Sequence, residues 1–94
     1  MLKINRIDRT VTLLGYPMRL TPNEHRILFL LASEPDRIFS AVEILSLAFP
    51  AEKAVSKNQL AVHVSGINKK ATVISGRPLI ENPHKSGYRI NPHL

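Results

Sequence analysis

The residues best placed to do chemistry lie between Ser56 and Ala71, where small polar side chains and lysines share one side of an expected helix. Apolar residues recur there at spacings of four, three and four: Leu60, Val64, Ile67 and Ala71. This period predicts one buried stripe. At about 100° per residue, the opposite side carries Asn58, Ala61, Val62, Ser65, Gly66 and Lys69. Such a short, polar and basic side suits the groove of a nucleic acid, and the alternative is an ordinary amphipathic surface helix.

Catalytic and metal chemistry find no support in the other polar residues. An activated nucleophile needs a neighbouring base, and a metal site needs clustered ligands. The sequence has no cysteine, and its four histidines are scattered, with no pair at helical spacing. They are His25, His63, His84 and His93. The serine–glycine pairs at 75–76 and 86–87 are turn signals, and no glycine-rich phosphate loop is present. We therefore expect no enzyme, no cofactor and no metal site.

Positive charge is concentrated in the second half of the chain. The whole sequence has thirteen Lys and Arg against seven Asp and Glu, a net charge of +6. Residues 56–94 hold six of these basic groups and one acidic group, which makes +5 for this part. A one-sided basic field indicates a polyanionic partner, most often a nucleic acid. The competing interpretation is a basic surface that serves solubility or an acidic protein partner.

Length and hydropathy limit the architecture. Ninety-four residues are enough for one domain, here 1–94, with one modest core. No apolar run approaches the roughly 18 residues of a membrane span, and residues 1–20 do not form the apolar block of a signal peptide. Because the chain also lacks cysteine, we expect a cytoplasmic protein with no membrane contact.

The first 20 residues are expected to form a small antiparallel sheet, over residues 2–20. Residues 10–13 form a β-branched alternating run, and Asp8-Arg9 before it is a candidate turn. Gly15-Tyr16-Pro17 interrupts this run, and residues 18–20 are expected to form a third strand.

Three helices are expected next, and a capping box indicates the start of each. In this motif a Ser or Thr side chain and the side chain three residues later satisfy each other's free backbone N–H groups. The pairs are Thr21 with Glu24, Ser40 with Glu43, and Ser56 with Gln59. They predict helices at about 22–34, 41–48 and 57–71. The first is too apolar for a surface helix and is expected to be central in the core.

The last part of the chain is expected to form a hairpin. Short extended runs surround a polar tip over residues 79–90, with His84, Lys85 and Arg89 at or near the tip. The expected order of elements is a helix, the loop 49–55, a basic helix and then a hairpin. This order is that of a winged helix-turn-helix, a fold of the α+β class. We call the hairpin 79–90 the wing.

At this point the chain resembles a known family, the winged-helix DNA-binding domain of OmpR/PhoB-type bacterial response regulators. The resemblance covers nearly the whole length. Four segments carry it in the right order: LTPNE at 20–24, IFS at 38–40, VHVS at 62–65 and GYRI at 87–90. It implies an N-terminal four-stranded sheet, three helices and a C-terminal hairpin, and a transcription regulator of two-component systems that binds double-stranded DNA.

The resemblance also implies residue roles. The helix 57–71 would enter the major groove, and the wing would touch the backbone or the minor groove. The expected DNA-binding residues are Lys57, Asn58, Val62, His63, Ser65, Gly66, Lys69, Lys70, His84, Lys85 and Arg89. In the family, the loop matching 49–55 can contact RNA polymerase. A dimer on DNA and a nucleoid-associated location are further expectations.

Several positions depart from the family pattern. Gly66 and Asn68 stand where the family commonly has arginines, and Ala61 replaces the usual aspartate. PHK at 83–85 replaces the usual valine-arginine-glycine of the wing. Fewer cations then face phosphates, so the expected affinity is modest. The alternative function is therefore a winged-helix protein-interaction module with weak or no sequence-specific DNA binding.

Overall fold

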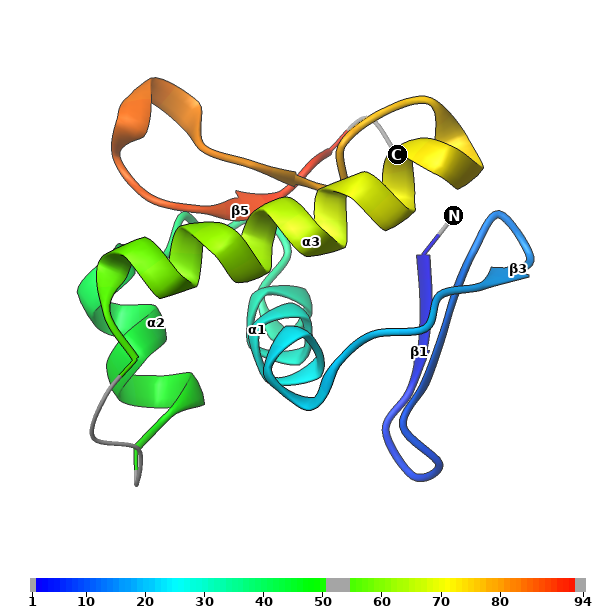
Figure 1. Ribbon diagram of the computed structural model, residues 1–94, viewed down its shortest axis with the longest axis horizontal. Coiled ribbons are helices and arrows are strands. Elements are labelled where there is room, and N and C mark those ends of the chain that lie inside the picture. Colours follow the sequence, from blue (N-terminus) through cyan, green and yellow to red (C-terminus); the bar gives the residue numbers. More distant parts are fainter. Residues whose placement is uncertain (1, 51–54, 93–94) are drawn as a thin grey trace.

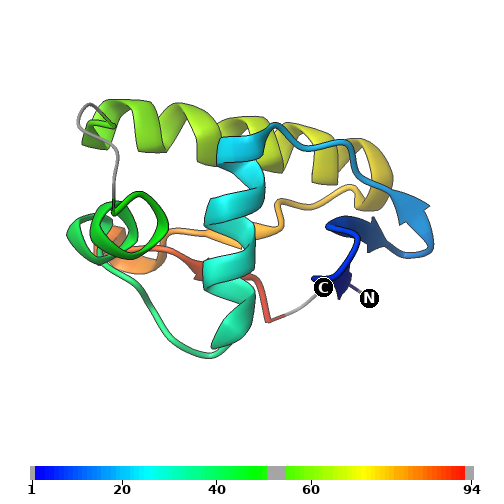
Figure 2. The ribbon, with the colours of Figure 1, turned by 90° about the horizontal axis from the view of Figure 1, so that it is seen from below.

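The longest element is a helix, α3 (Lys57–Ser75), which lies across α1 (Pro22–Ser33) and beside α2 (Ala41–Ala48) in this computed structural model (Figure 1). The structure describes residues 2–50 and 55–92. Both views place α1 between α2 and the N-terminal sheet (Figure 2). In the described part of the chain, an N-terminal antiparallel sheet, three helices and a C-terminal hairpin follow one another, which confirms the predicted fold class.

The N-terminal sheet has the order β1 (Leu2–Asn5), β2 (Thr10–Leu13) and β3 (Tyr16–Pro17), all antiparallel. The prediction of a third strand at 18–20 was wrong. Leu14 and Gly15 have φ of 53° and 82°, which makes a two-residue hairpin turn, so the chain pairs again at once. Over the described residues this sheet has three strands, not the four that the resemblance implied.

Reciprocal caps open the first two helices. The Glu24 N–H donates to Thr21 Oγ1 (3.2 Å), and the Thr21 N–H donates to Glu24 Oε1 (2.9 Å). Ser40 and Glu43 make the same pair of bonds, at 3.1 and 2.9 Å. Each box satisfies two N–H groups that have no partner within the helix. The helices were expected at 22–34 and 41–48. The first is observed at Pro22–Ser33, one residue shorter, and the second at Ala41–Ala48, as expected.

The third helix starts at the third box and runs farther than expected. The Gln59 N–H donates to Ser56 Oγ (3.1 Å), and the Ser56 N–H donates to Gln59 Oε1 (2.8 Å). The helix continues to Ser75, four residues past the expected end at 71. It ends at Gly76, whose N–H makes the last helical bond, to the Thr72 carbonyl, and whose left-handed φ of 76° then turns the chain out of the helix. The stop is therefore set by this glycine and not by the last residue of the apolar stripe.

The wing contains β4 (Ile80–Glu81), a short 3-10 turn η1 (Pro83–Lys85) and β5 (Arg89–Ile90). Ile80 pairs with Ile90, and Glu81 pairs with Arg89. Arg89 is thus in the second strand, near the tip and not at it. Tyr88 also exchanges two backbone hydrogen bonds with Phe39, at 2.8 and 2.9 Å, which ties the wing to the segment before α2.

The core lies where the helices, β2 and the wing meet. The predicted stripe of α3 is confirmed, because all four of its apolar residues are buried: Leu60, Val64, Ile67 and Ala71. Ile27, Leu28 and Leu31 of α1 are fully buried against it, so α1 is central as expected. Within the described residues, no helix is long and apolar enough to cross a membrane. No group of three His, Asp or Glu residues there could hold a metal ion.

Candidate nucleic-acid interface

The side of α3 opposite the core is open to solvent. Five of the expected DNA-binding residues are exposed there: Lys57, Asn58, Val62, Ser65 and Lys69. Val62 has 68% of its surface exposed, so its apolar side chain is available for contact on this side of the helix. The other three expected residues on this helix are half-buried and turn toward α1: His63, Gly66 and Lys70. We call the five exposed residues the reading face.

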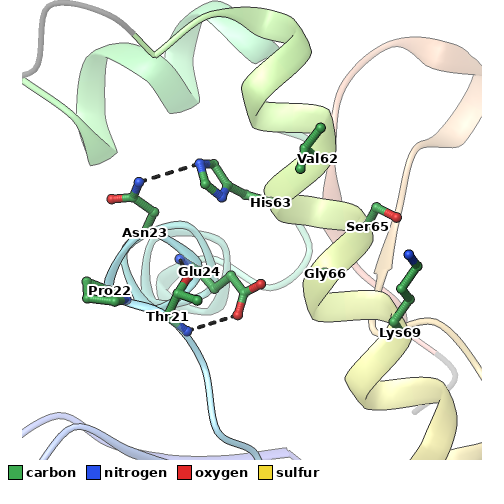
Figure 3. A pocket seen from close by; sticks show the side chains of 9 residues that line it. All are labelled: Thr21, Pro22, Asn23, Glu24, Val62, His63, Ser65, Gly66 and Lys69. Carbon is green, nitrogen blue, oxygen red and sulfur yellow. Dashed lines mark hydrogen bonds between the residues drawn. The ribbon is translucent and has the colours of Figure 1, made fainter.

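A groove of about 600 Å³ runs between the reading face and the start of α1 (Figure 3). Its walls are the N-terminal turn of α1, residues 21–24, and the middle of α3. His63 points across it, and Asn23 Nδ2 lies 3.4 Å from His63 Nε2 in a hydrogen bond. His63 therefore contacts the protein itself and is half-buried at the edge of the helix. The contact of His63 with a phosphate stays a prediction.

Glu24 is a buried carboxylate at the floor of this groove. Its side chain is only 7% exposed, and Lys70 Nζ donates to Oε1 at 2.6 Å. A Cβ atom placed on Gly66 would lie 2.3 Å from the other oxygen, Oε2. Glycine at this position therefore leaves room for the carboxylate. Lys70 has an anionic partner within the protein, which reduces the positive charge it offers to a phosphate.

The wing presents two cationic or polar side chains at its tip. His84 and Lys85 are exposed, and both adopt left-handed backbone conformations, with φ of 53° and 57°. Arg89 is half-buried, and its Nε donates to Glu81 Oε1 on the paired strand. The pairing neutralises Arg89 locally, so Lys85 is the wing cation whose side chain is exposed at the tip. The DNA contacts of all three wing residues remain predictions.

Sequence reasoning missed the role of Asn68, which it treated as the replacement of a base-reading arginine. Asn68 Nδ2 donates to the Ile80 carbonyl (2.9 Å), and the Ile80 N–H donates to Asn68 Oδ1 (2.8 Å). The side chain therefore joins α3 to the first strand of the wing. No local pattern predicts this contact, because the helical period places Asn68 beside the buried stripe but does not indicate which distant strand packs there.

A helix with an exposed polar and basic face, packed on two others and followed by a hairpin, defines a winged helix-turn-helix domain. The chain belongs to the family of C-terminal domains of transcriptional regulatory proteins, whose family model matches residues 15–90. It is thus a DNA-binding domain of a transcription regulator of the OmpR/PhoB type. No curated protein matches the sequence.

Solved structures share the fold. The chain is similar to the DNA-binding domain of the response regulator AdeR in complex with an intercistronic region, with 20% identity, a TM-score of 0.84, and coverage of 96% of this chain and 93% of that one. The Klebsiella pneumoniae RstA DNA-binding domain in complex with the RstA box gives 23% identity, a TM-score of 0.78, and coverage of 98% and 92%.

One of the similar structures belongs to a regulator that is longer than this chain. The response regulator DrrB, a Thermotoga maritima OmpR/PhoB homologue, is 26% identical, with a TM-score of 0.80. The match covers 96% of this chain but only 41% of DrrB. The chain therefore spans about two-fifths of the length of that regulator.

Proposed function

We propose that this domain controls transcription by inserting α3 into the major groove of double-stranded DNA while the wing lies on the backbone or in the minor groove. The observation that carries this proposal is the reading face, which is exposed while the apolar stripe on the other side of α3 is buried in the core. The net charge of +5 on residues 56–94 supports it. The AdeR and RstA domains in the two similar structures are each in complex with DNA.

Within the reading face, side-chain chemistry assigns the roles. Asn58, Val62 and Ser65 contact base edges, because an amide, an apolar surface and a hydroxyl each recognise features exposed in the major groove. Lys57 and Lys69 contact phosphates, which position the domain without reading the sequence. Lys85 extends the same charge to the wing.

The remaining expected residues contribute less directly. His63 and His84 lie beside phosphates, whereas Gly66 faces Glu24 and contributes only through the packing of α3 on α1. Lys70 and Arg89 each have a carboxylate partner, Glu24 and Glu81, so they add less to binding than the exposed lysines. The affinity for DNA is accordingly modest.

A second candidate function is a winged-helix module that contacts another protein. The observation that favours it is that Gly66 and Asn68 serve contacts inside the protein, where the family commonly has arginines. A reading face without arginine offers few strong base contacts. Val62, largely exposed, would then belong to a protein interface.

A mobility-shift titration on random duplex DNA at increasing salt separates the two functions. Each neutralised phosphate releases counterions, so four to six contacts give a log–log slope of about −4 to −5. A flat response, or no shift at low salt, would favour the interaction module. Selection of bound sites from a random duplex pool would then supply a preferred duplex.

Further partners are part of the same proposal. Two copies of the domain bind adjacent sites on DNA, and the domain acts in the cytoplasm on the nucleoid. The loop 49–55 contacts RNA polymerase, although residues 51–54 of this loop lie outside the described residues. The activity and signal of any longer regulator that contains this domain are proposals too, since the chain spans only part of DrrB.

A further inference from the structure

Asn68 completes the hydrogen bonding of the wing's first strand. An asparagine amide offers a donor and an acceptor, as a peptide group does. Its two bonds, at 2.9 and 2.8 Å, reach the carbonyl and the N–H of the same residue, Ile80. On its other side β4 pairs with β5, and the Asn91 N–H donates to the Leu79 carbonyl (2.7 Å). Asn68 thus takes the place of a neighbouring strand along this edge.

These bonds restrict motions that apolar packing alone allows. Leu79 and Ile80 are buried against the core, which opposes separation of the wing from the body. Apolar contact is not directional, however, so it resists sliding and rotation only weakly. The backbone bonds between Phe39 and Tyr88 hold the β5 side of the wing, and the two directional bonds from Asn68 to Ile80 hold β4 against both movements. In Figure 1 the wing runs alongside α3, so a small rotation of β4 would move its tip relative to the helix.

The constraint continues from Ile80 toward the tip. Glu81 and Arg89 are joined across the two strands by an ion pair. Beyond them, the Gly87 N–H donates to Asn82 Oδ1 (3.3 Å), which closes the base of the turn. Lys85 is therefore connected to α3 through a short series of hydrogen-bonded residues. The position of its backbone relative to the reading face is defined before any DNA binds.

We infer that Asn68 is a positioning residue, which holds the wing at a fixed place relative to the reading face so that both contact one duplex together. The inference rests on the proposed function. A preorganised wing binds with a smaller loss of conformational freedom than a wing that must be ordered on DNA. Without the Asn68 amide, Lys85 would contribute less to affinity although its own side chain is unchanged.

The first measurement needs no DNA. Backbone ¹⁵N relaxation of the whole chain would be compared for the unsubstituted protein, Asn68→Ala and the control Ser40→Ala. The Ser40 side chain caps α2, so its removal destabilises the protein without touching the bonds between helix and wing. We expect lower order parameters at residues 82–87 in Asn68→Ala only. Unchanged order parameters in Asn68→Ala would overturn the inference.

The second measurement is a double-mutant cycle on a duplex selected from a random pool by the unsubstituted protein. Lys85→Ala is made alone, with Asn68→Ala and with Ser40→Ala. For independent sites, the affinity loss of the double variant equals the product of the two single losses to within about twofold. For coupled sites, it differs from that product by more than about threefold. We expect such coupling between Lys85 and Asn68, with Lys85→Ala losing most of its effect, and none between Lys85 and Ser40. Additive losses for Lys85 and Asn68 would instead indicate a direct DNA contact of Asn68 and overturn the inference.

Asn68→Arg provides a second variant, because arginine is a good helix former but cannot accept a hydrogen bond from the Ile80 N–H. We expect its salt slope to steepen by about one unit, since a cation is added, while the contribution of Lys85 still falls. An unchanged contribution of Lys85 would overturn the positioning role. Failure of the unsubstituted protein to bind any duplex would refute the proposed function and, with it, a role of Asn68 in recognition, whatever the relaxation data show.

Discussion

Gly66 lies directly against the carboxylate of Glu24, so close that a Cβ atom at position 66 would stand 2.3 Å from Oε2. The two residues come from different helices, α3 and α1. The Glu24 side chain cannot move away from Gly66 without losing hydrogen bonds, because its other oxygen, Oε1, accepts from the Thr21 N–H and from Lys70 Nζ. The contact explains a glycine in the middle of a helix, where glycine otherwise costs about 1 kcal/mol relative to alanine.

This contact makes the effect of Gly66→Ala depend on Glu24. In the unsubstituted protein we expect Gly66→Ala to lower the free energy of unfolding, because Glu24 must rotate away from Thr21 and Lys70. In a Glu24→Ala background, the same change should raise the free energy of unfolding by up to about 1 kcal/mol, the gain in helix propensity. Urea unfolding of the four proteins measures both effects. Equal effects in the two backgrounds would contradict the contact.

The cap of α3 should contribute measurably to stability. Ser56 Oγ accepts from the Gln59 N–H, and Ser56→Ala removes this bond. We expect a loss of about 1 kcal/mol in the free energy of unfolding. Ser46→Ala, at an exposed position inside α2, is the matched control and should change it little. Equal denaturation midpoints for Ser56→Ala and the unsubstituted protein would mean that water replaces the cap.

Stability should fall in mild acid because of His25. Its ring packs edge-on against Phe29, with centroids 5.3 Å apart. Burial, and then the positive charge of Arg9, hold the pKa of His25 below its ordinary value of 6.5. As the pH falls, the unfolded chain therefore takes up this proton before the folded chain does. The stability contributed by neutral His25 is complete above pH 6.5 and is lost as the pH falls through the lower, folded pKa.

Chemical unfolding at about pH 7.5 and about pH 5.5 tests this dependence. The decline in unfolding free energy between the two values should be smaller in His25→Gln, which cannot titrate. A decline of the same size in both proteins would assign the acid sensitivity to other groups.

Helix and wing should contribute differently to DNA recognition. Asn58 is exposed on the reading face, so Asn58→Ala should relax preference at one or two base pairs, by about 1–3 kcal/mol if its contact is bidentate. Lys85→Ala should weaken binding to all sequences alike and lower the salt slope by about one unit. Titrations of both variants on a preferred and a scrambled duplex measure this. The two roles would be reversed if Lys85→Ala changed the preference between the two duplexes while Asn58→Ala weakened binding to both equally.

The sequence alone determined the features that depend on neighbours a few residues apart. Each capping box needs only a hydroxyl and an acceptor three residues later, so Thr21, Ser40 and Ser56 indicated the helix starts. The period of Leu60 to Ala71 likewise predicted a buried stripe, because every helix places such residues on one side. Motif order then identified the fold class and the family.

Only the tertiary structure decided which polar residues on α3 are free. Lys70 pairs with Glu24 across 46 positions of the chain, His63 with Asn23 across 40, and Asn68 with Ile80 across 12. Helical periodicity places Asn68 at the edge of the buried stripe, and the wing packs along that edge and bonds its amide. A side chain's partner in such cases depends on where packing places distant elements, and no pattern within one helix contains that information.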